Sequence, residues 1–452
     1  MPQVIPTIFK QDAIQGEYPG ELNEGSAYLL GRAFAQLLGA RKVVVGRDAR
    51  PSSESLANSF IRGLIQEGVT VHDLGWSSAP YLGFACQQAD YDGSVLITGP
   101  NDSYTQNGFV LTRARSMQLT FDTGIAELRD RVRNGIPDYR PAPGQHLAKD
   151  YSTIYLDAIT RGRIIKKLKV AIDTANGMAG LTVPAILQRF PQLEVVPIHF
   201  AIDGRFPNHL PDLQASDALI KLKGSIKINK CDLGVAFDGD GDQISFITQQ
   251  GELIAGDFVG ALLAQRQLLK HSAGVILYDV RSSRALSQEV KKLGGAALVT
   301  ASDGTTIKKA MRDKQAVFAT TSDRHYYFKD FYNLANGDYA LLELLEILSN
   351  TDQQIQELLS PLKQYVQSGP IVLPVSDPEA ALTAIVAKFK AGRQAMLDGI
   401  SIEYPDWHMH LDIEPDETTL RFNIEAKTSE VLKEKRAQLI ELLRPFSISS
   451  TS

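Results

Sequence analysis

The chain has 452 residues, of which 44% are hydrophobic and 22% are charged, as in ordinary globular proteins. These values exclude a disordered, collagen-like or coiled-coil chain. The 47 basic and 52 acidic residues give a net charge of −5, which disfavours nucleic-acid binding by bulk charge. No apolar run is long enough to span a bilayer, the N-terminus lacks the pattern of a signal peptide, and two cysteines form no disulfide framework. We therefore expect a cytoplasmic protein with neither a nucleic-acid nor a membrane partner.

Strand and helix patterns alternate through most of the chain. Short β-branched or apolar runs followed by helical spacing occur near residues 42–99, 169–242 and 274–349, and the third segment closes with the apolar helix 339–349. Such alternation predicts three α/β units whose mostly parallel sheets are covered on both faces. The last ~90 residues differ, because three alternating strand patterns lie between helices expected at 379–390 and 429–443. They predict a small α+β domain with an antiparallel sheet.

The sharpest local motif is FDGDGD at residues 237–242, directly after an apolar run. Two glycines permit a tight turn, and the alternation directs Asp238, Asp240 and Asp242 toward one point. Carboxylate oxygens in this arrangement suit Mg²⁺. The alternative is an ordinary acidic turn at a strand end. The twelve-residue spacing and closing glutamate of an EF-hand are absent.

Other polar residues also follow predicted strands. Arg47 and Arg50 in the motif GRDAR lie where ligands bind α/β sheets, although Arg47 could equally pair with Asp48 or with a neighbouring domain. The glycine-rich turn DTANGMAG at residues 173–180 lacks the dinucleotide and Walker spacings, so we interpret it as structural. The lone histidines, His209 among them, are also more consistent with structural roles.

The order of these motifs resembles that of the α-D-phosphohexomutase family, which includes phosphomannomutase/phosphoglucomutase. The similarity covers GRDAR, TG…NGF, DTANG, DGRFPNH, FDGDGD and a C-terminal α+β domain. It implies three tandem mixed-sheet α/β domains and a fourth α+β domain around a central cleft, with boundaries at 1–144, 145–250, 251–365 and 366–452. It further implies phosphoryl transfer from an active-site phosphoserine to a sugar phosphate, supported by Mg²⁺ on the aspartate loop.

The family's serine loop has the form T-[AG]-S-H-N-P followed by N-G-F-K, whereas this chain reads TGPNDSYTQNGFV. The match without gaps places Pro100 at the phosphoserine position, Asn101 at the histidine and Val110 at the lysine. Proline offers no nucleophile. Asp102 and Ser103 are the nearest substitutes, but a loop that fixes a nucleophile does not readily accept such a shift.

Other loops of the family pattern depart in the same way. The sugar-reading loop G-E-M-S-G reads TTSDR at residues 320–324, and the phosphate clamp R-x-S-N-T-x-P reads DIEPDE at residues 412–417. In the latter, Asp412, Glu414, Asp416 and Glu417 would repel a phosphate dianion. The candidate residues of the implied ligand cleft are Arg47, Arg50, Asn101, Asn107, Arg281, Asp323, Arg324 and His325.

Three functional hypotheses remain open. The first is a pseudoenzyme that lacks standard mutase activity and binds a ligand. The second is an active phosphohexomutase or phosphotransferase with Asp102 or Ser103 as a non-standard nucleophile. The third is a regulatory role in carbohydrate metabolism, with an active mutase or a polysaccharide-pathway protein as partner. Because the family's metal also takes a phosphoserine oxygen, which Pro100 cannot supply, we expect only weak Mg²⁺ binding at the aspartate loop.

Overall fold

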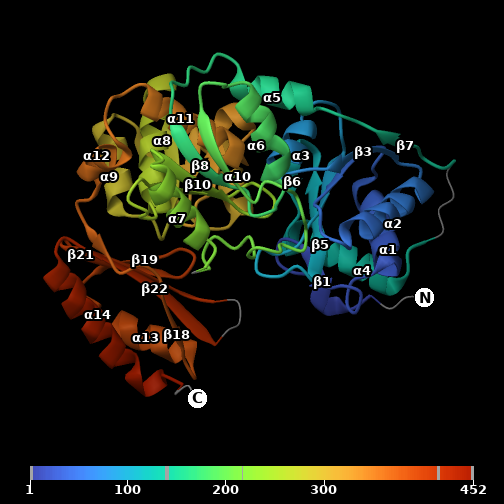
Figure 1. Cartoon of the computed structure of the whole chain (residues 1–452). Helices are drawn as coiled ribbons and strands as arrows, with labels where there is room; N and C mark the ends of the chain where they lie inside the picture. The colour runs from blue at the N-terminus through green and yellow to red at the C-terminus, as the bar shows by residue number, and fades with distance from the viewer. Residues whose placement is uncertain (1–3, 138–141, 216, 415–417, 449–452) are drawn as a thin grey trace. The chain divides into compact units, whose positions relative to one another are not determined.

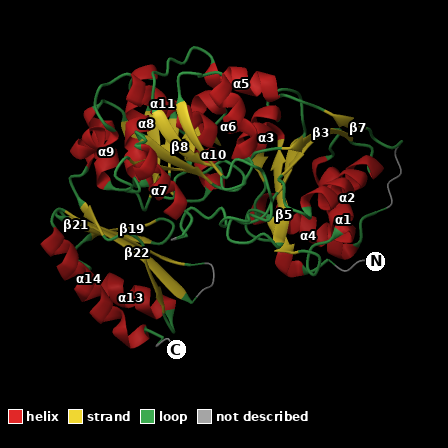
Figure 2. Cartoon of the chain, viewed as in Figure 1, coloured by secondary structure: helices red, strands yellow, loops and turns green. Residues whose placement is uncertain are grey.

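The computed structural model describes residues 4–137, 142–215, 217–414 and 418–448. The chain forms two compact units, Met1–Ile254 with Asp323–Ile355 and Ala255–Ser322 with Gln356–Ser452. Among the described residues, none of the helices has the length and apolar character needed to cross a bilayer. Figures 1 and 2 show the elements within each unit.

The first sheet of the first unit is mixed, with strand order β1-β5-β4-β2-β3-β7 and β6 paired to β5. Strands β2, β3, β4 and β7 run parallel, whereas β5 is antiparallel to β1 and β4. The strands are β1 (Ile14–Glu17), β2 (Lys42–Arg47), β3 (Thr70–Trp76), β4 (Gly93–Ile97), β5 (Gln106–Arg113), β6 (Met117–Gln118) and β7 (His146–Ala148). Because β7 pairs with β3, this sheet extends beyond residue 144, where the sequence placed the domain boundary.

Helices cover both faces of this sheet, as the apolar strands require. Helices α1, α2 and α4 lie on one face and α3 on the other (Figure 1). Helix α1 begins with a capping box between Asn23 and Ser26 and ends at Gly39, whose φ of 58° suits a left-handed C-cap. The helices are α1 (Glu24–Leu38), α2 (Ser53–Gln66), α3 (Ala79–Ala85), α4 (Ala126–Asn134) and α5 (Ser152–Thr160).

The second sheet of this unit has the order β11-β10-β8-β9. Strands β8, β9 and β10 are parallel, and β11 returns antiparallel to β10. Its elements are β8 (Lys169–Asp173), α6 (Ala179–Gln188), β9 (Glu194–Ile198), α7 (Ile220–Asn229), β10 (Leu233–Phe237) and β11 (Ile244–Thr248). The same unit holds the hairpin β15 (Tyr326–Phe328) and β16 (Leu334–Ala335) and the buried helix α11 (Gly337–Ser349). The carboxyl ends of β8, β9 and β10 therefore meet at one sheet edge.

The second unit begins with an α/β layer in which β12 pairs in parallel with both β13 and β14. Its elements are α8 (Gly256–Lys270), β12 (Val275–Asp279), α9 (Arg284–Lys292), β13 (Ala296–Thr300), α10 (Gly304–Asp313) and β14 (Phe318–Thr320). Arg281 follows β12 and so lies at the carboxyl edge of these parallel strands.

The C-terminal part is the expected antiparallel sheet, with order β17-β22-β21-β20-β19 and β18 paired to β22. Helices α13 and α14 cover one face of it (Figure 2). Its elements are β17 (Val366–Gln367), β18 (Ile371–Pro374), α13 (Pro378–Lys388), β19 (Arg393–Met396), β20 (Ile400–Glu403), β21 (Trp407–Ile413), β22 (Thr419–Ala426) and α14 (Ser429–Leu443). A short helix α12 (Ile355–Leu359) and single 3₁₀ or π turns at 6–8, 114–116, 121–125, 329–331, 360–362 and 444–446 complete the described elements.

Candidate functional site

The aspartate loop, residues 238–242, follows the buried strand β10 as the sequence predicts. The Oδ1 atom of Asp238 accepts hydrogen bonds from the amides of Gly241 (2.9 Å) and Gln243 (3.2 Å), which close the turn. Gly241 has a φ of 86°, a conformation that favours glycine. Carboxylate oxygens of Asp238, Asp240 and Asp242 lie within 4.8 Å of one another. The loop therefore gathers three hard oxygen ligands.

Burial makes this concentration of negative charge costly. Burial and the charge of Asp242 raise the pKa of Asp238 to about 7. Burial and the charges of Asp242 and Asp238 raise the pKa of Asp240 well above its ordinary value. The Oδ1 atom of Asp240 is buried and accepts no hydrogen bond. An unpartnered oxygen beside two further carboxylates fits a cation such as Mg²⁺.

His325 supplies positive charge to the aspartate loop. Its Nε2 atom lies 3.3 Å from Asp242 Oδ1, and its Nδ1 atom lies 3.0 Å from Asp323 Oδ1. Burial lowers the pKa of His325, but the charges of Asp323 and Asp242 outweigh that effect and raise the pKa well above its ordinary value. Arg324, which lies between Asp323 and His325 in the sequence, donates a hydrogen bond to the Leu213 carbonyl at 3.3 Å. The sequence selected Asp323, Arg324 and His325 as candidates for a ligand cleft, and the structure brings His325 to the aspartate cluster.

The loop between β4 and β5 approaches the same aspartates. Thr98 N donates to Gly108 O at 3.2 Å, so the loop begins and ends on paired strands. The Asn101 amide donates from Nδ2 to Asp238 Oδ2 (3.0 Å), and its Oδ1 atom accepts from the Gly239 amide (3.2 Å). Asn101 therefore contacts the aspartate loop through a neutral amide.

Buried Arg50 donates hydrogen bonds to the backbone of this loop. It forms an ion pair with Asp48 (2.9 Å), donates to the Pro100 carbonyl (2.7 Å), and also donates to the Ser103 carbonyl. Its guanidinium lies 5.1 Å from the centre of the Phe206 ring. Only 3% of Arg50 is exposed. These contacts direct the donors of Arg50 into the scaffold, and its role in a ligand cleft stays a prediction.

Two further cleft candidates also have internal partners. Arg47 pairs with Asp73, 3.2 Å away, and not with Asp48. Asn107 is fully buried, and its Nδ2 atom donates to the hydroxyls of Ser52 (2.8 Å) and Ser53 (2.9 Å). Asn107 therefore links β5 to the start of α2, and its role in a ligand cleft stays a prediction.

The substitute nucleophiles Asp102 and Ser103 line a hollow of about 390 Å³ with residues 205–210. The Ser103 hydroxyl accepts hydrogen bonds from the amides of Thr105 (3.2 Å) and Gln106 (3.3 Å). It thereby caps the turn that leads into β5. Both residues are thus placed on the side of the loop that meets the segment 205–210.

In the second unit, the acidic segment that begins at Asp412 pairs with arginines. Asp412, near the end of β21, forms an ion pair with Arg281. Glu414 forms an ion pair with Arg421, which lies on β22, at 3.1 Å. Asp416 and Glu417 lie outside the described residues. The cleft candidate Arg281 therefore has an internal carboxylate as its partner.

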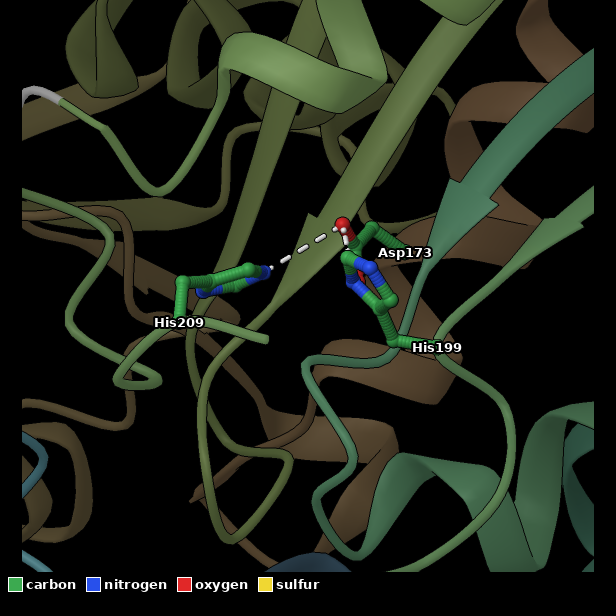
Figure 3. Close-up of side chains that lie close together, drawn as sticks. All are labelled: Asp173, His199 and His209. Carbon is green, nitrogen blue, oxygen red and sulfur yellow. Dashed lines mark hydrogen bonds and ion pairs between the residues drawn. The ribbon is translucent and has the colours of Figure 1, made fainter. Parts of the chain in front are cut away.

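A second polar cluster, which the sequence analysis did not identify, lies at the ends of β8 and β9. His199 Nδ1 lies 3.0 Å from Asp173 Oδ1, and His209 Nε2 lies 3.4 Å from Asp173 Oδ2 (Figure 3). Asp173 belongs to the turn interpreted as structural, and His209 was interpreted as a lone structural histidine. The signal available in the sequence was position: Asp173 ends one predicted strand and His199 lies at the end of the next.

Comparisons with known proteins agree on one family. Three family models match, described as phosphoglucomutase/phosphomannomutase, alpha/beta/alpha domains I, II and III, at residues 6–136, 153–251 and 255–365. A phosphomannomutase of Escherichia coli is 29% identical over 97% of this chain and 99% of its own. A phosphomannomutase/phosphoglucomutase of Pseudomonas putida is 31% identical over 89% of this chain and 88% of its own. A crystal structure of a family protein from Burkholderia thailandensis matches with a TM-score of 0.90 at 27% identity, covering 98% of both chains.

Proposed function

We propose that this chain, which belongs to the phosphoglucomutase/phosphomannomutase family, has lost standard mutase catalysis and acts by binding a ligand or partner in carbohydrate metabolism. The main support is the hydrogen bond of 3.0 Å that the Asn101 side-chain amide donates from Nδ2 to Asp238 Oδ2. Phosphoryl transfer through an enzyme intermediate needs a nucleophilic oxygen, nitrogen or sulfur close to the charge-neutralising group. An amide and the neighbouring Pro100 supply no such nucleophile.

The pairing of Arg281 with Asp412 supports the same proposal. A bidentate arginine is the preferred partner of a phosphate, and a carboxylate on that arginine competes with it. A sugar phosphate that approached Arg281 would first have to displace Asp412, and would meet Glu414 nearby in the chain. The ligand we propose is therefore less anionic than a hexose phosphate.

Mg²⁺ fits the aspartate loop as a weakly held ion. Asp238, Asp240 and Asp242 would hold it, and when bound it would neutralise negative charge on a ligand oxygen. Two features oppose tight binding: the Asn101 amide already engages Asp238, and His325 already compensates Asp242. The buried, unpartnered oxygen of Asp240 favours some residual affinity.

The second candidate function is an active phosphotransferase that uses Asp102 or Ser103. It is favoured by their exposure to the hollow shared with residues 205–210. Intact-mass measurement after incubation with glucose 1,6-bisphosphate separates the two candidates. A mass increase of one phosphoryl group, lost in Asp102→Asn or Ser103→Ala, would establish the second. An unchanged mass supports the first, and co-purification from the native host would then identify a partner.

The decisive experiment is a ³¹P NMR time course with glucose 1-phosphate or mannose 1-phosphate, catalytic glucose 1,6-bisphosphate and Mg²⁺. An active family mutase serves as the positive control, and a blank without protein as the negative one. We expect no formation of the 6-phosphate above the blank. Conversion at a rate comparable to the control would overturn the proposal and would make Asp102 and Ser103 the first residues to mutate.

A further inference from the structure

The cluster formed by Asp173, His199 and His209 lies in a protected place at the edge of the second sheet. Side-chain exposure is 1% for Asp173, 5% for His199 and 8% for His209. Asp173 ends β8, His199 follows β9, and His209 returns from the loop that follows (Figure 3). Their nearest nitrogen and oxygen atoms all lie within 4.8 Å of one another. Two imidazoles and one carboxylate thus converge on a buried point.

A hydrogen bond from His209 to a backbone carbonyl fixes the tautomer of its ring, so that a nitrogen lone pair faces the carboxylate of Asp173. Its Nδ1 atom lies 2.8 Å from the Leu210 carbonyl oxygen, which can only accept, so Nδ1 carries the proton. In the neutral ring, Nε2 is then an acceptor that faces Asp173 Oδ2, another acceptor, at 3.4 Å. Two facing acceptors need a proton or a cation between them. A histidine that binds a metal through one nitrogen usually donates a hydrogen bond from the other nitrogen, often to a backbone carbonyl.

The carboxylate is held in place in a similar way. Asp173 Oδ1 accepts a hydrogen bond from the Ala175 amide at 2.8 Å, which leaves Oδ2 directed toward His209. Ligand atoms bound to one tetrahedral Zn²⁺ at about 2.0–2.1 Å lie about 3.3 Å apart. From Asp173 Oδ2, the Nδ1 atom of His199 lies 3.1 Å away and the Nε2 atom of His209 lies 3.4 Å away, and both separations are close to this value.

We infer that Asp173, His199 and His209 form a binding site for Zn²⁺ or a similar divalent transition ion, distinct from the aspartate loop. Imidazole nitrogens favour such ions, whereas an all-carboxylate loop favours Mg²⁺. Three protein ligands leave a fourth position open for water or a ligand atom. The inference does not depend on the proposed loss of mutase activity, because none of its three ligands belongs to the aspartate loop or to the loop of Pro100.

Lys221 competes with the ion. Its ammonium group lies 3.0 Å from His199 Nε2 and donates to it, which places the imidazole proton on Nδ1, facing Asp173. Metal binding requires that proton to move to Nε2 and Lys221 to withdraw. Lys221 is exposed, so its side chain can turn into water. Removal of this lysine should therefore strengthen metal binding.

The test is a Zn²⁺ titration of the chelator-treated full-length protein against a chromophoric competitor, repeated with Co²⁺ to record visible absorption. We expect one equivalent of Zn²⁺ and the intense visible bands of tetrahedral Co²⁺. His199→Gln and His209→Gln should each weaken binding by at least about 10-fold, and Lys221→Met should tighten it by about 10-fold. Asp242→Asn, in the aspartate loop, is the matched control and should leave the Zn²⁺ affinity unchanged.

If Asp242→Asn abolishes Zn²⁺ binding and His209→Gln leaves it unchanged, the ion binds at the aspartate loop. That result would overturn the inference. An absence of saturable Zn²⁺ binding would show that a proton alone fills the gap between His209 and Asp173, and would overturn it as well. Lys221→Met keeps the test valid if the histidine variants fold poorly, because that side chain is exposed. An unchanged affinity in Lys221→Met would also count against the proposed geometry.

Discussion

Two acidic segments, the aspartate loop at 238–242 and the segment that begins at Asp412, balance their negative charge in different ways. In the aspartate loop, three carboxylates share one imidazole, and Asp240 keeps a buried oxygen without a hydrogen bond. In the second unit, Asp412 and Glu414 each pair with an arginine. Carboxylates therefore leave negative charge available to a cation in the aspartate loop, whereas arginines neutralise them in the second unit.

The largest effect is expected from breaking the pair between Arg281 and Asp412. Arg281→Ala leaves a mostly buried carboxylate without its partner, which should lower the free energy of unfolding by about 3 kcal/mol. Chemical denaturation measures this loss. The control is Arg393→Ala, which removes an exposed arginine 3.9 Å from Glu403 and should cost less than about 1 kcal/mol. Equal losses in the two variants would contradict the comparison.

Another buried carboxylate, Asp338, accepts hydrogen bonds from neutral donors. It accepts hydrogen bonds from Tyr155 (2.8 Å) and Thr182 (2.9 Å), and burial raises its pKa to about 6. A raised pKa means that the folded state holds the proton more tightly than the unfolded state. The contribution of protonated Asp338 to the free energy of unfolding is therefore complete below about pH 4. It is lost as the pH rises through about 6, and the loss is at most about 3 kcal/mol.

Asp338→Asn tests this expectation by removing the titrating group. Its unfolding free energy should fall less between pH 4.5 and pH 7.5 than that of the parent protein, as measured by denaturation at both values. Asp122→Asn, at an exposed carboxylate, should retain the parental pH dependence. Identical pH profiles for all three proteins would show that Asp338 is ionised in the folded state.

We expect Asp412 to prevent anions from binding at Arg281 in the second unit. Asp412→Asn removes the charge that neutralises Arg281 and leaves a guanidinium free to bind phosphate. Inorganic phosphate should then stabilise the variant by about 1 kcal/mol, the value expected at a few times Kd, while the parent protein is unaffected. Thermal unfolding with phosphate, against chloride at equal ionic strength, measures the difference. Equal shifts in both proteins would mean that Asp412 does not block anions.

The smallest effect is expected from Mg²⁺ at the aspartate loop. Millimolar Mg²⁺ should stabilise the protein by about 0.4 kcal/mol, the value for half-saturation of a weak site. Asp240→Asn should abolish this shift, because it removes the charge of the unpartnered carboxylate. Asp412→Asn is the control and should retain it. A thermal shift of many degrees would contradict weak binding and would reopen the question of phosphoryl transfer.

The sequence predicted most of the fold because the relevant signals are local. Helix α14 spans Ser429–Leu443 as expected, and α13 and α11 differ from their predicted bounds by two residues or fewer. The short helix α3 at Ala79–Ala85 is a weaker case, because so few residues carry little periodic signal. The pairing of β7 with β3 also could not be predicted, because it depends on a distant strand.

For the candidate site, the sequence identified the aspartate loop because its three ligands lie within five residues. It also identified the unusual Pro100 and Asn101, but it could not show that the Asn101 amide reaches Asp238, 137 positions away. Arg50 and Asn107 were selected by their place at strand ends, and only packing revealed that their donors point into the scaffold. Position along a strand predicts proximity to a sheet edge, but the direction of a side chain depends on its neighbours.

The amino-acid sequence alone reveals the alternation of strands and helices, the family resemblance and the residues that replace the serine loop. These follow from composition, periodicity and motif order, which are properties of neighbouring residues. Only the tertiary structure decided that Asp412 pairs with Arg281, 131 positions away, and that His199 and His209 meet at Asp173. Strand register and the return of loops bring together polar groups from distant segments, and burial then favours pairing between them because an unpaired buried polar group is costly.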